Sequence, residues 1–388
     1  MNRFNENEIN AVVNVIKNGK YLSGFTSKYY GGEQVQKFEE KFARFIGVKH
    51  ALTFNSGTTA LLVAFRAIIE YEKRKRGKKS QIPSICLPAY TFTADPSAAL
   101  LAHGKIIFED IDEKSYCMLP VKQECQISVP TYLLGNAPDK IGRGKSKFLI
   151  EDCCQALGTK VNGKVVGSMG DLSVFSFQET KHITTLGEGG MICSNNEELI
   201  EIAAAIRNHA EFYREEKFLG YNFRMTEAQA AFGIEQLKKI NSILTKFRNN
   251  ARYIMKKLPN GIEPPYISPK VEHSFLMIGC LYNEKQIGIK RNIFLEKLTQ
   301  NRKHILENDE KSDIRGINMR SGKFIGTGYS KPLYDIHTYK KYKPKNGCPK
   351  IENLLKKSLW MDIHKFRTRN EISEELDILN DTIKKFQK

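Results

Sequence analysis

The feature that most constrains the fold is the alternation of short apolar runs with helical segments over the first two-thirds of the chain. Residues 33–46 place their apolar side chains on one helical face, and residues 50–54 follow as a short buried strand. Residues 148–150 and 173–177 are further apolar runs that each end at a polar cluster. The alternation predicts an α/β fold in which helices cover a mostly parallel sheet.

This alternation of apolar runs and helical segments changes after about residue 245. Just before the change, Thr226 and Gln229 have the spacing of a capping box and predict the start of a helix. Apolar residues repeat through that helix at Ile234, Leu237, Ile240 and Leu244. We therefore predict a large domain over residues 1–245 and a smaller C-terminal α/β domain over residues 246–388.

Composition indicates a globular protein and disfavours a membrane protein. The 388 residues are 41% hydrophobic and 27% charged, and no apolar run approaches the roughly 18 residues of a membrane span. The start, MNRFNENEIN, is polar and has no signal-peptide core. The eight cysteines show no CxxC spacing. We expect reduced thiols, no bound metal and a cytoplasmic location.

The charge balance raises the question of a polyanionic partner. Lys and Arg number 61 against 43 Asp and Glu, which gives a formal net charge of +18. The excess is spread along the chain, and its densest blocks, at residues 73–79 and 340–345, lie in no nucleic-acid-binding motif. We expect solvated basic surfaces, which are compatible with a nucleotide diphosphate and do not favour nucleic acid as a partner.

Polar residues follow three of the predicted strands, where ligands collect in parallel sheets. Gly57 and Thr58 open a helix, and a helix N-terminus suits a phosphate, although any N-cap has this form. Asp152 follows a second strand, where a carboxylate needs a cation, a metal or donors; a structural ion pair is the alternative. Ser176 and Lys181 follow the third.

These groups together match the needs of pyridoxal phosphate. A lysine is usually a solvated charge, but inside a site its neutral amine can form a Schiff base. The cofactor also needs a phosphate cradle, a carboxylate that keeps its pyridine nitrogen protonated, and an aromatic side chain for stacking. Phe92, which follows another predicted strand, is the candidate for stacking, and a place in the core is its alternative.

Five ordered segments resemble the DegT/DnrJ/StrS sugar aminotransferases, which are fold type I enzymes that use pyridoxal phosphate. The segments are GGEQVQKFEEKFARFIGVKHALTFNSGTTAL, LPAYTFTA, EDCCQALG, FSFQETKHITTLGEGGM and LGYNFRMTEAQAAFGIEQL. They occur in family order over about residues 8–245, and GYSKPLY at 328–334 extends a looser match. The resemblance implies transfer of an amino group from an amino acid, which we take to be glutamate, to a keto group of a nucleotide-linked sugar.

The resemblance also implies a role for each residue of the site. Lys181 bonds to the cofactor and then acts as general base, and Asp152 binds the pyridine nitrogen. The other cofactor-binding residues are Gln155 near the ring, Phe92 stacked on it, Gly57, Thr58 and Ser176 at the phosphate, and Asn222, which reaches the phosphate across a subunit boundary. The role of Asn222 requires a homodimer with a shared active site.

Lys181 also distinguishes between branches of the family. A sugar 3-dehydratase branch has a histidine at this position, which cannot form the imine, so the lysine favours an aminotransferase. We expect the neighbouring His182 to pack beside the site, with substrate contact as the alternative. Two other functions stay open. One is a cyclitol or aminohydroxybenzoate-type enzyme, and the other is a non-catalytic, basic nucleic-acid-binding or regulatory relative.

Four features depart from the family pattern. Leu186 is one extra residue after Lys181, and Cys153 and Cys154 stand where small residues are usual. The basic segment 71–84 replaces a shorter acidic turn, and the polar segment 307–326 predicts a surface loop that has no match. We expect Leu186 to reshape the loop near the substrate without changing the cofactor roles, and segment 71–84 to affect substrate entry and surface charge. The two cysteines have no functional account, although small buried thiols fit the same space.

Overall fold

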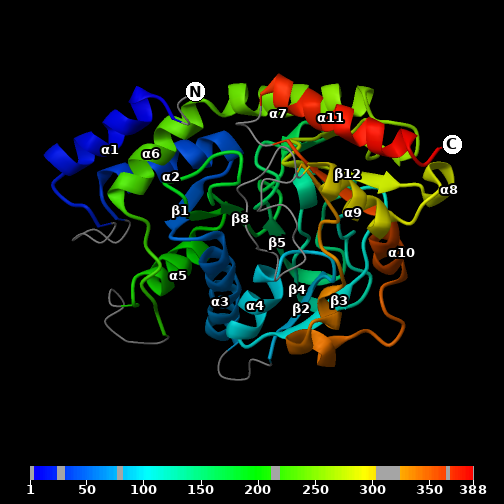
Figure 1. The fold of residues 1–388 in the computed structure, drawn as a ribbon. Helices are drawn as coiled ribbons and strands as arrows, with labels where there is room; N and C mark the ends of the chain where they lie inside the picture. Colours follow the sequence, from blue (N-terminus) through cyan, green and yellow to red (C-terminus); the bar gives the residue numbers. More distant parts are fainter. Residues whose placement is uncertain are drawn as a thin grey trace.

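The computed structural model of the chain describes residues 4–23, 31–76, 82–210, 219–302, 324–363 and 368–387. At its centre is a seven-stranded sheet in the order β1-β9-β8-β5-β4-β2-β3 (Figure 1). The strands are β1 His50–Phe54, β2 Ser84–Pro88, β3 Lys105–Glu109, β4 Cys125–Ser128, β5 Ser146–Asp152, β8 Leu172–Ser176 and β9 Gly190–Ser194. Neighbours from β8 to β3 pair in parallel, whereas β9 pairs antiparallel with β8 and β1. The predicted α/β fold with a mostly parallel sheet is confirmed.

Helices cover both faces of this sheet (Figure 1). They are α2 Glu33–Ile46, α3 Gly57–Arg76, α4 Ala94–Leu101, α5 Glu197–Arg207 and α6 Glu227–Lys238, with a 3-10 turn η2 at Leu133–Gly135. Helix α1, Glu6–Asn18, packs against α6. Side chains alternate between the faces of a strand. Val174 and Ile192 therefore pack into a core with α3, α4 and α5, and their neighbours Phe175 and Met191 pack into a second core with α2 and α6.

Local sequence signals set several of these boundaries. Helix α2 ends at Gly47, whose φ of +85° is a left-handed conformation that glycine adopts without strain. Helix α6 begins with the predicted capping box, in which the Gln229 N–H donates to Thr226 Oγ1 (3.3 Å) and the Thr226 N–H donates to Gln229 Oε1 (3.1 Å). The helix predicted over residues 33–46 and the capping box predicted at Thr226 are both confirmed.

The prediction of a single helix that begins at Thr226 and includes Leu244 is wrong. Helix α6 ends at Lys238, and α7 runs separately from Ile240 to Lys256. Lys239, with φ −96° and ψ 0°, breaks the helix between them. The apolar repeat continues through the break because Ile234, Leu237, Ile240 and Leu244 are all buried in the second core. The apolar repeat therefore indicates that both helices pack on the same core, and it does not reveal the interruption at Lys239.

The C-terminal part of the chain builds a second, antiparallel sheet in the order β10-β12-β14-β13. Its strands are β10 Ile262–Glu263, β12 Met277–Tyr282, β13 Ile325–Gly326 and β14 Ser358–Asp362. Helices α7, α9 (Arg291–Arg302) and α11 (Arg369–Lys384) share a third core with it, and α8 is a short turn at Glu284–Ile287. A small three-stranded sheet joins β11 Val271–Glu272 with β6 Lys160–Val161 and β7 Lys164–Val165.

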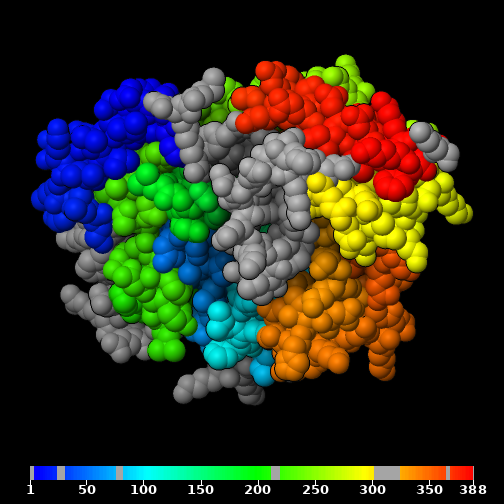
Figure 2. Space-filling model, in the orientation of Figure 1, coloured from blue at the N-terminus to red at the C-terminus, as the bar shows by residue number. Residues whose placement is uncertain are grey.

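Segments after β13 return to the large sheet. They comprise the 3-10 turns η3 Leu333–Asp335 and η4 His337–Tyr342 and the helix α10 Pro349–Lys357. Leu333, Tyr334 and Ile351 lie in the same core as α3 and β2, and Tyr339 OH lies 2.7 Å from Ser97 Oγ. Figure 2 shows the orange segment that contains η4 directly against the cyan segment that contains α4. Part of the C-terminal third is therefore packed into the large core.

Three further predictions concern the domain boundary, the loop at residues 307–326 and membrane spans. The predicted domain boundary at residue 245 falls inside α7, and the division into 1–245 and 246–388 stays a prediction. Of the predicted loop 307–326, residues 307–323 lie outside the described residues, and the end of it forms β13. Within the described part of the chain, no helix combines the length and apolar character needed to cross a bilayer.

Candidate active site

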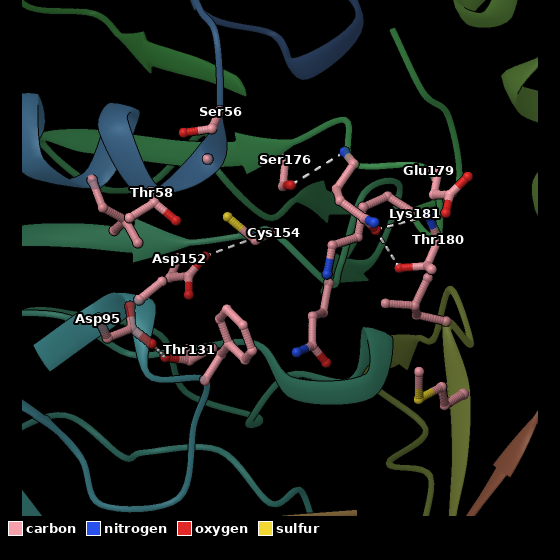
Figure 3. Close-up of a pocket in the computed structure, with 18 of the residues that line it drawn as sticks. Ser56, Thr58, Asp95, Thr131, Asp152, Cys154, Ser176, Glu179, Thr180 and Lys181 are labelled. Atoms are coloured by element: carbon pink, nitrogen blue, oxygen red, sulfur yellow. Dashed lines mark hydrogen bonds between the residues drawn. The ribbon is translucent and has the colours of Figure 1, made fainter. Parts of the chain in front are cut away.

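A cavity of about 480 Å³ lies where the parallel strands of the large sheet end (Figure 3). Seven of the eight predicted cofactor-binding residues line it: Gly57, Thr58, Phe92, Asp152, Gln155, Ser176 and Lys181. They lie at or just after the carboxyl ends of β1, β2, β5 and β8, which a mostly parallel sheet brings to one edge. Asn222, the eighth, is exposed and forms an isolated bridge with Asn208 outside this cavity.

The N-terminus of α3 supplies backbone donors to the cavity. The hydroxyl of Ser56 accepts from the Thr59 N–H at 3.1 Å and caps the helix. The N–H groups of Gly57 and Thr58 precede this capped position, and no acceptor for them lies in the described part of the chain. These two donors and the positive end of the helix dipole suit an anion.

Gly57 makes a close approach to the end of β8. A β-carbon at this position would lie 2.9 Å from Ser176 Cβ and 3.3 Å from Cys154 Sγ. The absence of a side chain at Gly57 therefore keeps a small hollow open between the first turn of α3 and the Ser176 hydroxyl. This hollow, edged by backbone N–H groups and a hydroxyl, has the chemistry of a phosphate cradle.

Asp152 is the last residue of β5 and is 4% exposed. Its Oδ1 accepts from the Cys154 N–H at 3.0 Å, while its own N–H donates to the Pro130 carbonyl at 3.0 Å. No Lys or Arg of the described residues forms an ion pair with it, so the structural ion-pair alternative finds no support. The carboxylate is held by the backbone and faces the cavity, ready for a cationic ligand (Figure 3).

Lys181 lies on the loop after β8, and hydrogen bonds fix the course of that loop. The Lys181 N–H donates to the Gln178 carbonyl (2.8 Å), and Gln178 Oε1 accepts from the N–H and hydroxyl of Thr180 (2.8 and 2.6 Å). The Phe177 N–H donates to the Gly189 carbonyl at 2.8 Å, which ties the loop to the glycine-rich turn. Leu186, which we predict to be an extra residue, has φ +58°, is half exposed and does not line the cavity.

His182 turns away from the cavity, as expected for a packed residue. It is 1% exposed, its Nε2 lies 3.2 Å from the Ser274 carbonyl oxygen, and its ring lies 4.8 Å from the ring of Phe247 on α7. His273, close to it, is also buried, and desolvation with the nearby charges of His182 and Arg248 lowers its pKa to about 3. This pair connects the Lys181 loop to α7 and does not line the cavity.

Sequence reasoning missed several residues that line the cavity. They are Asp95 and Thr131 beside Asp152, Cys154, and the residues Met277, Tyr329, Trp360 and Asp362 from the C-terminal third. Burial raises the pKa of the Cys154 thiol well above its usual range, so the thiol is neutral. The segment GYSKPLY contained a signal for Tyr329, whereas nothing in the local sequence around Trp360 placed it here.

An aromatic cluster forms the C-terminal wall of the cavity. The rings of Tyr329 and Trp360 lie 4.9 Å apart, and Tyr90 lies behind them, 5.5 Å from Tyr329. The amide nitrogen of Gln155 lies 3.3 Å from the Tyr329 hydroxyl, and Gln155 Oε1 accepts from the Leu134 N–H at 2.9 Å. Gln155 therefore links the predicted cofactor side of the cavity to this wall.

Pyridoxal phosphate fits this set of groups. The hollow at Gly57 and Ser176 accommodates a phosphate, Asp152 has an open carboxylate for a protonated ring nitrogen, and Lys181 offers an amine to the aldehyde. The fold and the cavity thus define a pyridoxal-phosphate-dependent enzyme of the α/β class. The sequence model of the DegT/DnrJ/EryC1/StrS aminotransferase family matches residues 2–308, and the chain belongs to this family of pyridoxal-phosphate-dependent aminotransferases.

The relatives of the chain include a transaminase and a dehydratase, and its fold is shared by a solved aminotransferase structure. A UDP-4-amino-4,6-dideoxy-N-acetyl-β-L-altrosamine transaminase of Campylobacter jejuni is 39% identical over 234 residues, which are 56% of this chain and 59% of the relative. A GDP-4-keto-6-deoxy-D-mannose 3-dehydratase of Yersinia pseudotuberculosis is 32% identical over 303 residues, 69% of this chain and 72% of the relative. The structure of Helicobacter pylori PseC, an aminotransferase involved in pseudoaminic acid biosynthesis, shares the fold with a TM-score of 0.80, 24% identity and coverage of 99% and 98% of the two chains. The predicted family, enzyme class and cofactor are confirmed.

Proposed function

We propose that this enzyme transfers an amino group from glutamate to the keto group of a nucleotide-linked sugar. The observation that carries the proposal is that Lys181, Asp152 and Ser176, which follow two different strands, line one cavity. The transaminase from Campylobacter jejuni, whose name describes a UDP-linked amino sugar, supports the substrate class. The +18 net charge is compatible with a diphosphate group on the substrate.

Two residues carry the chemistry. Pyridoxal phosphate, when bound, supplies an aldehyde that takes up the amino group and a ring that accepts electrons. Lys181 Nζ would hold the cofactor through this aldehyde and would also serve as the general base that removes and returns a proton. Asp152 keeps the ring nitrogen protonated because its negative charge stabilises the positive charge there.

The remaining predicted residues position the cofactor. We assign the Gly57 and Thr58 N–H groups and the Ser176 hydroxyl to the phosphate, Phe92 to stacking on the ring and Gln155 to the ring edge. Asn222 is exposed on the same chain, so we assign it to the phosphate of a second copy. This assignment requires a homodimer in which each subunit completes the other's site.

The C-terminal wall faces the substrate. Tyr329 and Trp360 present flat apolar surfaces with polar atoms at their edges, and Asp362 adds a carboxylate beside them. Such a wall suits the face and the hydroxyl groups of a sugar ring. A cyclitol has the same surfaces, so the cyclitol-type enzyme is the second candidate, and the substrate panel below separates the two.

Other functions are less well supported. The dehydratase of Yersinia pseudotuberculosis is a relative, but Lys181 in the cavity favours amino transfer over dehydration. A non-catalytic nucleic-acid-binding role would give no reason for Lys181, Asp152 and Ser176 to line one cavity.

All eight cysteines are free, which supports the proposed cytoplasmic location because disulfides persist in oxidising compartments.

The test is a substrate panel with purified enzyme, pyridoxal phosphate and glutamate. UDP-, GDP- and dTDP-linked keto sugars and keto cyclitols are incubated separately, and mass spectrometry detects the exchange of a keto oxygen for an amino group. We expect an aminated nucleotide sugar and 2-oxoglutarate in equal amounts. A deoxygenated sugar without nitrogen would establish the dehydratase reaction, and amination of cyclitols alone would establish the second candidate.

A further inference from the structure

A second carboxyl group is buried beside Asp152. Asp95, in the first turn of α4, is 1% exposed and lines the same cavity. Its Oδ2 accepts hydrogen bonds from Thr91 Oγ1 at 2.5 Å and Thr131 Oγ1 at 3.2 Å. Its Oδ1 is buried, and no partner for it is found among the described residues. The side chain therefore has one satisfied oxygen and one oxygen that still requires a partner.

Asp152 is in position to be that partner. Thr131, which holds Asp95, pairs with Asp152 in a parallel bridge, so the two carboxyl groups are connected through one backbone contact. Figure 3 shows Asp95 and Thr131 next to Asp152. Titratable groups that interact with this pair include the thiols of Cys153 and Cys154 and the hydroxyl of Tyr329, and burial raises the pKa of each.

Two buried carboxylates side by side cannot both be ionised without a large cost. Burial and then the charge of Asp152 raise the pKa of Asp95 well above its usual range, which favours the protonated form of Asp95. Because the two threonine hydroxyls donate to Oδ2, the proton belongs on Oδ1. The orphaned oxygen thereby becomes a donor, which is the group that a neighbouring carboxylate needs.

We propose that Asp95 is a positioning residue: a neutral carboxylic acid that donates a hydrogen bond from Oδ1 to the Asp152 carboxylate and keeps that carboxylate ionised beside the cofactor ring. The inference rests on the proposed role of Asp152 and extends it. A hydrogen bond to the charged form of a carboxyl favours that form. Asp95 therefore helps to keep the proton on the ring nitrogen, because a stabilised Asp152 competes less for it.

The first experiment tests the proton on Asp95 without any substitution. Infrared spectra of the full-length protein, with and without pyridoxal phosphate, are compared between unlabelled protein and protein labelled with ¹³C at the aspartate carboxyl carbon. A protonated carboxyl band that shifts on this labelling and persists at pH 7–8 is expected. The label is necessary because burial also raises the pKa of Glu39 and Glu151, whose bands do not shift. Absence of an aspartic acid band would overturn the proposal.

The second experiment separates donation from space filling. In Asp95→Asn the amide can donate to Asp152 and accept from both threonines, whereas Asp95→Ala can do neither. Thr91→Val is the matched control, because it removes a donor to Oδ2 and leaves the acid in place. The readouts are the ¹⁵N signal of ring-labelled pyridoxal phosphate and the pH profile of kcat.

We expect Asp95→Asn and Thr91→Val to show the ¹⁵N signal of a protonated ring. The acid limb of their kcat profiles should lie at the same pH as in the parent enzyme. In Asp95→Ala we expect the ¹⁵N signal of the ring to move toward the position of a neutral pyridine. The acid limb of the kcat profile should then move up by about one to two pH units. Equal behaviour of Asp95→Asn and Asp95→Ala would show a structural role only and overturn the proposal. The infrared result decides even if Asp95→Ala does not fold, and it stands apart from the substrate panel, so failure of one does not imply failure of the other.

Discussion

Ser176 Cβ lies 2.9 Å from the point that a β-carbon would occupy at Gly57. The end of β8 and the first turn of α3 thus meet with no side chain between them. This contact leaves the Gly57 and Thr58 N–H groups and the Ser176 hydroxyl around one small hollow. Its dimensions depend on the absence of a side chain at a single position.

Substitution Gly57→Ala should therefore weaken cofactor binding. Because the added methyl group must displace Ser176, we expect the Kd for pyridoxal phosphate to rise about tenfold or more, equivalent to ~1.4 kcal/mol or above. Titration of the cofactor-free protein by fluorescence quenching measures it. Gly142→Ala is the matched control, because a β-carbon there would meet nothing within 4 Å. Equal affinities in the two variants would contradict the assignment of the hollow to the phosphate.

Replacement of the lysine should remove both of its functions. In Lys181→Ala, borohydride should fix no cofactor on the protein, and turnover should fall by at least about 10²-fold because the general base is lost. Mass spectrometry of tryptic peptides detects the reduced adduct. Lys164→Ala, at an exposed position on β7, should retain both properties. A reduced adduct on another lysine in Lys181→Ala would move the covalent site elsewhere.

Removal of the Asp152 charge should separate binding from catalysis. In Asp152→Ala the phosphate contacts remain, so we expect the protein to retain bound cofactor while kcat falls ~10- to 10³-fold, the range set by opposite-charge coupling. Cofactor content by absorbance and kcat by product formation are measured on the same preparation. Near-normal turnover would remove Asp152 from the mechanism.

The hydroxyl and the ring of Tyr329 should have different effects. Tyr329→Phe loses the 3.3 Å contact with Gln155 and keeps packing against Trp360, so we expect KM for the sugar substrate to rise about two- to tenfold. Tyr329→Ala also loses the aromatic wall and should raise KM further. Initial rates over a range of substrate concentrations distinguish the variants. If both substitutions left KM unchanged, the wall would have no part in substrate binding.

His273 should make the fold sensitive to acid. Its Nδ1 accepts from the Phe275 N–H at 2.8 Å, and desolvation lowers its pKa to about 3 from the ordinary 6.5. Between these two pKa values the unfolded chain binds a proton at this position and the folded chain does not. The free energy of unfolding therefore decreases by about 1.4 kcal/mol for each unit by which the pH is lowered from 6.5 toward 3. In His273→Asn, which keeps an acceptor and does not titrate, urea unfolding between pH 6 and 4 should show a smaller loss. Identical slopes would exclude this residue as the cause.

The cofactor side of the site could be predicted from the sequence because each residue follows a strand. Parallel pairing brings strand ends to one edge, so Asp152 and Ser176 had to lie near each other once their strands were recognised. The resemblance to a family then assigned their roles. Helix α2 could be predicted for a different reason: the apolar face of residues 33–46 and the glycine that follows are local features of the sequence.

The substrate side could not be predicted in this way. Trp360 belongs to β14 of the second sheet, and its distance from Lys181 depends on how that sheet packs against the first. Asp95 was also missed, since its importance arises from a neighbour 57 positions later in the chain. Tertiary packing sets these relationships, and no local pattern contains it.

The return of η3, η4 and α10 to the large sheet has a consequence for biosynthesis. Leu333, Tyr334 and Ile351 complete the core that begins with α3, although hundreds of residues separate them along the chain. During translation, the helices and strands of this core keep apolar surface exposed until residues 333–351 have been synthesised. Chaperone demand should accordingly be highest before these residues are made, and a fragment ending at residue 245 should aggregate when expressed alone.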